Sequence, residues 1–594
     1  MANNSDEFQR DVFQRLVGLE TEYALFTPSL TGLSGSPAKP RQNRHAVFHE
    51  LVAALQSKIP CARARSMKEG VFHAAGGAVW FETERPAVGG GLVEGSTPEC
   101  RSPRQLLIWQ RAQDEMLADA ADTAFGSAVR LIKNDRDAEG NIYGAQENYE
   151  ATLATGWRLA VWRTALIALL PLAALTWLLL WLIDVAVTCY ALAATVVYLT
   201  AERLFPRPER LSRLLFGCSV KELAAETPTG PAWLEAILSV VARVLTAPLA
   251  VALFAVLWFI AFIQIRRELT PFLLSRAIIA GSGMVDDQGR FQLADKAAAM
   301  NCLTGFGGLL GDRPIYCLGH FFKTVYADAW LAPQQYARLF SGRQRLQISL
   351  GDSNLAETAE YLRVATTLLV IDAIEAGEMP PVPAVKRPIG SLRSICADPT
   401  LAARVPLAGG RKATAMEIQR FYFEACRRFL ARRAAAPEEA RDVLRRWEIA
   451  LDALGDDPQS LVGTLDWVTK RFILAKSGKG AAWDVCKKID IRYHELSPQG
   501  YFQRLKATGV VNELVSQAEI DHARRNPPAN TPAAVRGRYI REFSDDENGM
   551  SANWQAVFLG QGREVKVVRL DRYQQRSGDS GSASKRRERG DKYN

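Results

Sequence analysis

The chain has 594 residues, of which 48% are hydrophobic and 23% are charged, and its formal net charge is +9 at pH 7. These proportions are close to those of ordinary globular proteins, which excludes a mainly disordered chain, a fibrous repeat and a small disulfide scaffold. The nine cysteines are dispersed without a C-x-x-C pair, as is typical of reduced thiols in a cytosolic protein.

The first predicted strand contains the segment GLETEYAL, in which Glu20 and Glu22 are two residues apart. Side chains alternate along a strand, so both carboxylates are expected on one face. Two neighbouring acids on an apolar strand repel each other unless a cation neutralises them, and carboxylate oxygens suit Mg²⁺ that bridges to nucleotide phosphates. A solvated acidic face on an edge strand is the alternative interpretation.

More acidic residues follow in the first 150 residues. GGAVWFETE places Glu82 and Glu84 on one strand face, Glu94 and Glu99 bracket a Ser-Thr-Pro turn, and GAQENY adds Glu147. The six histidines form no H-x-x-H or H-E-x-x-H motif, so a metal site is expected to depend on carboxylates. Together these patches predict a carboxylate-lined site for a nucleotide and its metal.

The composition then changes abruptly to a long apolar insert. About twenty apolar residues lie between Thr164 and Ile183, and a second apolar run extends from Val244 to Ile265; both are long enough to span a bilayer. Buried core helices are the alternative. If the flanking segments form one domain, the number of crossings must be even, and we predict two. Three interpretations remain for the segment Val185–Thr200: a short second span, a re-entrant piece or a continuing helix.

The second half of the chain continues an α+β pattern. RLQISLGDS predicts a strand in which Arg345 directs its guanidinium toward phosphate or carboxylate, with a salt bridge to the acidic patches as the alternative. Helical periodicity covers Thr358–Gly377, Ala413–Arg433 and Pro437–Gly455. The tail from about Gln574 has almost no apolar residues and is expected to be disordered.

At these motifs the sequence resembles the Pup ligase and Pup deamidase family (Pup is the prokaryotic ubiquitin-like protein), within the glutamine-synthetase-like carboxylate–amine ligases. The matching segments include, in order, GLETEYAL, GAVWFE, STPEC, YGAQENY, LTPFLLSRAIIAGSG, RLQISLGDSNLAETAEYL, NPPANTPAAVRGRYI and ANWQAVFL. The resemblance implies an α+β fold with a glutamine-synthetase-like antiparallel sheet packed with helices, interrupted by an α-helical transmembrane hairpin and followed by a small C-terminal domain. The expected catalytic domain has two halves, 1–151 and 268–495, which the insert 152–267 separates. A small C-terminal domain at 496–572 and a disordered basic tail at 573–594 are expected to follow.

The resemblance also implies roles for individual residues. Glu20 and Glu94 match magnesium ligands, Glu82 stands in place of the catalytic Asp, and Thr97 and Trp554 match nucleotide contacts. The acidic patches add Glu22 and Glu99 as candidate metal ligands. The strand argument adds Arg345 as a candidate cofactor contact. Besides Glu82, four positions depart from the family pattern, with Trp80 for Tyr, Ala78 for Arg, and Gln146 and Gln347 for His.

The expected reaction follows from the resemblance. ATP and Mg²⁺ are the expected cofactors: ATP would phosphorylate a γ-carboxylate of a small modifier protein or peptide ending in Glu or Gln, and a lysine amine of an acceptor protein would attack to form an isopeptide bond. The short spacing from Glu20 to Glu82 favours a ligase over an amidase. An amidase that removes the modifier, and a non-catalytic nucleotide-binding homologue at the membrane, are the alternatives.

The expected surroundings follow from the insert and the charge. Membrane lipid is an expected partner, and the location is predicted to be the inner (cytoplasmic) membrane, multi-pass, with the catalytic domain facing the cytoplasm because the site needs ATP. No zinc-finger or RNA-binding signature is present, so nucleic acid is not an expected partner. The polar, acidic N-terminus MANNSDEFQR does not resemble a signal peptide.

Overall fold

A computed structural model describes most of the chain. The described residues are 12–26, 44–66, 68–82, 91–136, 142–204, 209–218, 231–307, 311–331, 333–478, 481–545, 549–560 and 565–570. They form two compact units, one of 1–151, 264–317 and 345–594 and the other of 152–263 and 318–344. The predicted tail 573–594 lies outside the described residues.

The first unit is built on one large mixed sheet, which has thirteen strands among the described residues. In spatial order these are β10 (Cys302–Gly305), β11 (Pro314–Cys317), β12 (Arg343–Ile348), β7 (Gln146–Thr152), β1 (Val17–Phe26), β5 (Leu92–Ser96), β4 (Ala78–Glu82), β3 (Gly70–His73), β2 (Cys61–Ala64), β15 (Met550–Ala552), β16 (Ala556–Leu559) and β17 (Lys566–Arg569), with β6 (Arg130–Ile132) paired to β1. Two of its pairings are parallel, β10 with β11 and β15 with β2, whereas β1 pairs antiparallel with β5, β6 and β7. Two further hairpins are β8 (Met284–Val285) with β9 (Phe291–Gln292) and β13 (Arg404–Pro406) with β14 (Lys412–Thr414).

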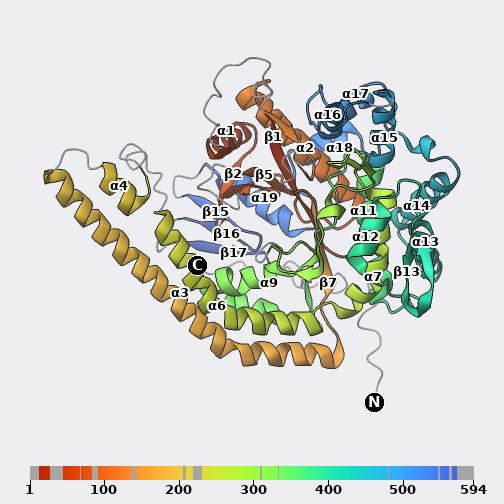
Figure 1. The fold of residues 1–594 in the computed structure, drawn as a ribbon. Helices are drawn as coiled ribbons and strands as arrows, with labels where there is room; N and C mark the ends of the chain where they lie inside the picture. The colour runs from red at the N-terminus through yellow and green to blue at the C-terminus, as the bar shows by residue number, and fades with distance from the viewer. Residues whose placement is uncertain are drawn as a thin grey trace, which may run out of the picture. The chain divides into compact units, whose positions relative to one another are not determined.

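Helices surround this sheet in the same unit (Figure 1). They are α1 (Arg44–Gln56), α2 (Pro103–Phe125), α7 (Ile263–Ser275), α8 (Ala277–Ala280), α11 (Glu357–Glu375), α12 (Pro388–Cys396), α13 (Ala415–Ala431), α14 (Glu438–Asp456), α15 (Asp466–Lys476), α16 (Trp483–Tyr493), α17 (Tyr501–Ala507), α18 (Gln517–Ala523) and α19 (Pro532–Phe543). A hydrophobic core joins α1 and α2 to the strands β1 to β5, and it includes Tyr23, Phe48, Leu51, Phe72 and Leu117.

Helix α2 covers one face of β1. The hydroxyl of Tyr23 donates to Asp114 at 2.7 Å, and that of Thr21 donates to Gln110 at 3.3 Å. Because side chains alternate along a strand, the residues between these two must project from the opposite face of β1. The sheet therefore has a helix-covered face and a second face on which the acidic side chains lie.

The sequence predictions of regular elements are largely confirmed. The strands expected at GLETEYAL, GAVWFE and RLQIS are β1, β4 and β12, and the three amphipathic helices are α11, α13 and α14. The predicted α+β class is confirmed, with a mixed sheet instead of a wholly antiparallel one. Strands β15 to β17, from the predicted C-terminal domain 496–572, extend the large sheet and belong to the first unit.

The second unit contains both apolar runs. Its helices are α3 (Gly156–Leu204), α4 (Glu209–Phe216), α6 (Ala232–Ile260), α9 (Gly319–Lys323) and α10 (Ala329–Leu331). Helix α6 runs back along α3 (Figure 1). Helix α3 has 49 residues and continues through Val185–Thr200. Of the three alternatives for that segment, a second span, a re-entrant piece and a continuing helix, the structure therefore shows the continuing helix. At 1.5 Å per residue its length is about 74 Å, more than twice the hydrocarbon thickness of a bilayer.

Both long helices are apolar enough and long enough to cross a membrane by length and composition. In each helix 17% of the most apolar window is buried within the protein, whereas a core helix would be mostly buried. Indole and phenol groups attach the 318–344 segment to α3: Trp162 donates to the carbonyl of Leu339 at 2.6 Å, and Tyr336 donates to that of Leu166 at 2.8 Å. The second unit therefore combines the apolar insert with a short later segment of the chain.

Candidate active site

Four carboxylates lie on the face of three neighbouring strands that points away from α2. In the pairing of β1 with β5, Glu22 is opposite Glu94 and Glu20 is opposite Ser96. On β4, Trp80 is opposite Glu94, and Glu82 follows two residues later on the same face. Directly opposed residues in an antiparallel pair have Cβ atoms about 4.5–5.5 Å apart, so the acids form one compact cluster. We call Glu20, Glu22, Glu82 and Glu94 the acidic cluster.

Lys68 is a cation of this cluster that the sequence analysis missed. Its ammonium forms ion pairs with the carboxylates of Glu82 and Glu94, the second at 2.6 Å. Burial lowers the pKa of Lys68, but the two carboxylates more than offset this effect and keep the pKa above its usual value. Nothing in the sequence near Lys68 indicated this role, because the contact depends on the turn that precedes β3.

The two inner carboxylates hold their protons unusually tightly. Burial raises the pKa of Glu22 to about 8, and the charges of Glu94 and Glu82 add to this effect. Burial also raises the pKa of Glu94 to about 7; Lys68 opposes the shift, and the charges of Glu20 and Glu82 strengthen it. The amide of Gly144 donates to Glu22 at 2.8 Å. A divalent cation bound among these carboxylates would favour their ionised forms and lower these pKa values.

Arg345 comes to the outer end of the cluster. Its guanidinium donates to Glu20 at 2.7 Å and to the side-chain oxygen of Asn148 at 2.6 Å. The salt bridge that the sequence left as an alternative is therefore present. Gln347 donates to Glu20 at 3.4 Å and also hydrogen-bonds Gln146, so the two glutamines that replace histidines of the family pattern meet beside Glu20.

The remaining three predicted site residues have other contacts. Thr97 is buried, and its hydroxyl accepts the amide hydrogen of Leu19 at 2.9 Å, which holds the end of β5 against β1. Both carboxylate oxygens of Glu99 accept from Arg536, at 2.6 and 3.1 Å. The same guanidinium lies 4.7 Å from the centroid of the Trp554 ring. The structure thus brings Glu99 and Trp554 together through Arg536, and it places Glu99 in an ion pair instead of among the four clustered acids.

The donor set of the acidic cluster fits Mg²⁺. Mg²⁺ is a hard cation that prefers carboxylate oxygens and is commonly held by one or two of them together with substrate phosphates. Glu20, Glu22 and Glu94 supply such oxygens from two adjacent strands, and burial, together with the neighbouring carboxylates, raises the pKa values of Glu22 and Glu94. Glu82 is more exposed, with 35% of its side-chain surface accessible, so it can reach a substrate at the rim.

Comparison with known proteins places the chain in a family. A family model described as Pup-ligase protein matches residues 15–558. Among curated relatives, a depupylase of Acidothermus cellulolyticus is 28% identical over 482 residues, which is 78% of this chain and 72% of that protein. A Pup deamidase/depupylase of Mycobacterium tuberculosis is 31% identical, and the alignment covers 52% of this chain and 60% of that protein. A Pup–protein ligase of Paenarthrobacter aurescens is 24% identical across 91% of this chain and 92% of that protein.

Solved structures show the same fold. The chain resembles the ligase PafA in a crystal structure of its complex with the prokaryotic ubiquitin-like protein Pup, with a TM-score of 0.62 and 20% identity over 94% of this chain and 89% of that chain. It also resembles PafA in complex with ADP, with a TM-score of 0.55 over 91% of this chain and 93% of that chain. At 20% identity these matches establish the fold alone.

Proposed function

The chain belongs to the Pup-ligase protein family, and we propose that it is an ATP- and Mg²⁺-dependent ligase that joins a glutamate carboxylate of a Pup-like modifier to a lysine amine. The observation that carries the proposal is the acidic cluster, in which three buried or half-buried carboxylates and one more exposed carboxylate share one face of the sheet. Curated ligases and the ADP-bound PafA structure support a nucleotide-dependent reaction.

The proposed chemistry has two steps. In the first, the γ-phosphoryl group of ATP is transferred to a carboxylate oxygen of the modifier, which gives an acyl phosphate and ADP. In the second, the lysine nitrogen attacks the acyl carbon, the new C–N bond forms as the C–O bond to phosphate breaks, and inorganic phosphate leaves. The amine proton goes to a carboxylate base of the protein.

Glu82 is suited to accept this proton. It lies at the end of β4, and its side chain is partly accessible, whereas Glu22 and Glu94 are buried. Lys68 contacts both Glu82 and Glu94 and so holds the base next to the metal ligands. When bound, Mg²⁺ offsets the charge of the transferring phosphoryl group. Glu20, Glu22 and Glu94 would hold it, while Arg345 neutralises the outer side of Glu20.

A hydrolase is the second candidate function. It is favoured by the similarity to a depupylase over 78% of this chain. In that reaction water replaces the lysine amine as the nucleophile, and the amide bond to the modifier is cleaved instead of formed. Glu82 would then accept the proton of water, so the same cluster serves both reactions and only the nucleophile differs.

We also propose that α3 and α6 anchor the enzyme in the cytoplasmic membrane with the active site in the cytoplasm. Support comes from the length and apolar composition of both helices and from their largely unburied surfaces. Residues on both sides of the insert build one sheet, since β7 precedes it and β12 follows it as neighbouring strands. Both ends of the insert therefore emerge on one side of the membrane, which requires an even number of crossings.

The activity test uses the full-length chain in detergent with ATP, Mg²⁺, a Pup-like protein ending in Glu and a lysine-bearing acceptor protein. Mass spectrometry should detect a covalent conjugate that forms only when ATP is present. Glu82→Gln should lower its rate by about 10²–10⁴-fold, because a positioned general base contributes about that much. Glu50→Gln, on the exposed side of α1, is the matched control and should leave the rate unchanged.

The alternatives predict different results in the same assay. Release of modifier from a preformed conjugate, without net conjugation, would replace the ligase by the hydrolase. Failure to bind ATP would reject the ligase, whereas ATP binding without conjugation or release of the modifier would leave the non-catalytic nucleotide-binding homologue. The anchor is tested separately by alkaline extraction of cell membranes: the full-length chain should stay in the pellet, and its release into the supernatant would reject the membrane proposal.

A further inference from the structure

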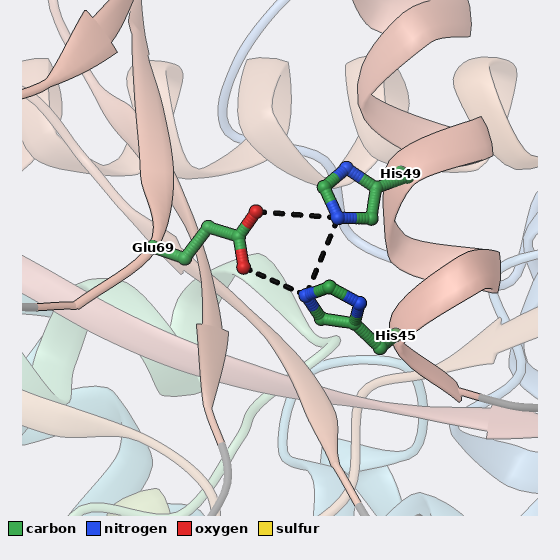
Figure 2. A group of neighbouring side chains, drawn as sticks. All are labelled: His45, His49 and Glu69. Atoms are coloured by element: carbon green, nitrogen blue, oxygen red, sulfur yellow. Dashed lines mark hydrogen bonds and ion pairs between the residues drawn. The ribbon is translucent and has the colours of Figure 1, made fainter. Parts of the chain in front are cut away.

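Two histidines and a glutamate meet on the helix-covered side of the same sheet (Figure 2). His45 and His49 are four residues apart on α1, so both imidazoles project from one face of the helix. Glu69 reaches them from the residue immediately before β3. The sequence contains this signal, because His45 and His49 have the i, i+4 spacing of the two histidines in H-E-x-x-H and lack only the glutamate of that motif.

The three ligand atoms converge. The Nε2 atom of His45 lies 2.7 Å from one carboxylate oxygen of Glu69, and that of His49 lies 3.2 Å from the other. The two Nε2 atoms are 3.3 Å apart. In a tetrahedral Zn²⁺ site with bonds of about 2.0–2.1 Å, neighbouring ligand atoms are about 3.3 Å apart. The separation of the two Nε2 atoms equals this spacing, and each histidine contacts a different oxygen of Glu69 within about 0.6 Å of it, so small shifts of the side chains would admit a common metal ion.

We propose that His45, His49 and Glu69 bind a transition-metal ion of the Zn²⁺ class. Two neutral imidazoles and a carboxylate are a known three-residue zinc set, which leaves a fourth position for water or another ligand. Imidazole nitrogen favours Zn²⁺, Co²⁺ or Ni²⁺ over Mg²⁺, whereas the all-carboxylate acidic cluster favours Mg²⁺. The two sites therefore select different ions.

Aromatic side chains hold the imidazoles in place. The centroid of the His45 ring lies 5.2 Å from that of Phe81, and the centroid of His49 lies 6.0 Å from that of Phe48. Both phenylalanines are buried, so each imidazole packs against a side chain that is held in place by its neighbours. About half of each histidine side chain is accessible, 41% for His45 and 53% for His49, so a metal ion can enter and leave from solvent.

The site is joined to the acidic cluster through the backbone. Lys68 and Glu69 are consecutive, and Lys68 contacts the acidic cluster while Glu69 contacts the histidines. The carbonyl of Glu69 also accepts the amide hydrogen of Phe81 at 3.0 Å, one residue before Glu82. A metal ion held by Glu69 would restrain the short segment that positions Lys68. The inference does not depend on which reaction the acidic cluster performs.

The test is titration of the full-length protein in detergent, purified without a polyhistidine tag, with Co²⁺ in the presence of excess Mg²⁺ that occupies carboxylate sites. We expect one Co²⁺ per chain and the visible absorption of a low-coordinate Co²⁺ ion with nitrogen ligands. His49→Ala and Glu69→Gln should each raise the Kd by more than about tenfold. All three side chains are partly or fully exposed, so these variants are expected to fold. His522→Ala, which removes an exposed histidine on α18, is the matched control and should bind Co²⁺ as the unmodified chain does.

Two results of the Co²⁺ titration would overturn the proposal. One is the absence of Co²⁺ absorption at micromolar protein and metal. The other is binding that His49→Ala and Glu69→Gln leave unchanged, which would place the ion elsewhere. The unfolding temperature gives an independent measurement, because a ligand that binds only the folded state stabilises it. Zn²⁺ should raise the unfolding temperature of the unmodified chain and of His522→Ala but not that of Glu69→Gln. An equal rise in all three proteins would also reject the site.

Discussion

A buried histidine should make the first unit sensitive to acid. His73 ends β3 with 2% of its surface exposed. Burial lowers its pKa from 6.5 to about 4, and repulsion from the guanidinium of Arg536 contributes to the shift. The folded state therefore binds fewer protons than the unfolded state between these two values. Because stability rises with pH wherever the unfolded state binds more protons, the free energy of unfolding should fall as the pH decreases from 6.5 toward 4.

The size of the effect follows from the pKa difference. Each unit of pKa difference corresponds to 1.36 kcal/mol, so the shift of His73 amounts to about 3 kcal/mol once the pH is below both values. The variant that tests this effect is His73→Gln, whose side chain is neutral and does not titrate in this range. Its lost packing lowers stability at every pH, but the part of the acid sensitivity that belongs to His73 should disappear.

The assay is denaturant unfolding of the full-length chain in detergent at several pH values between 7 and 4, for the unmodified protein and His73→Gln. The other titrating groups are common to both proteins, so the difference in unfolding free energy isolates His73. That difference should shrink by about 2–3 kcal/mol as the pH falls through this range. A difference that stays constant with pH would refute the inference that His73 is buried in its neutral form.

Two further substitutions test the support of the acidic cluster and a buried ion pair on the opposite face of the sheet, where Glu147 pairs with Leu19. Gly144→Ala should destabilise the protein, because Gly144 has φ of 112° and an added Cβ would collide with Asp135. It should also weaken Mg²⁺ binding, because the amide of Gly144 donates to Glu22. Thermal unfolding measures the first effect and Mg²⁺ titration the second. Arg276→Met should lower the unfolding free energy by about 3–5 kcal/mol, because it leaves Glu147 buried without its paired guanidinium, as denaturant unfolding would show.

Matched substitutions serve as controls for these two predictions. Gly126→Ala also faces a positive φ, of 55°, but its Cβ would meet no atom within 4 Å, so it should cost less than Gly144→Ala and leave Mg²⁺ binding intact. Arg267→Met removes an arginine whose side chain is 73% exposed, and it should change the free energy by less than about 1 kcal/mol. Equal losses within either pair would contradict the role assigned to burial.

Much of the acidic cluster was predictable because it depends on local periodicity. Glu20 and Glu22 share a face whenever their segment is a strand, and the alternation of polar and apolar residues is sufficient to predict that strand. The order of the family motifs likewise predicted that Glu82 and Glu94 belong to the same site. Strand pairing then placed Glu94 opposite Glu22.

The partners of these acids were not predictable in the same way. Lys68 reaches Glu82 and Glu94 across a turn, and Gln347 meets Gln146 from a strand about two hundred residues later. The sequence favoured Glu99 as a metal ligand, but its position next to Arg536 depends on how α19 packs near the end of β5. Contacts of this kind have no sequence period, because they join segments whose separation along the chain carries no information about their distance in space.

The sequence by itself determined the α+β class, the paired carboxylates and the two long apolar helices, since each depends on side-chain periodicity or on the length of an apolar run. Only the tertiary structure decided which cations neutralise the acidic cluster, and that His45, His49 and Glu69 converge. The physical reason is that electrostatic and metal-ligand contacts act over a few ångströms. Such contacts form only after the sheet and its covering helices have brought distant segments together.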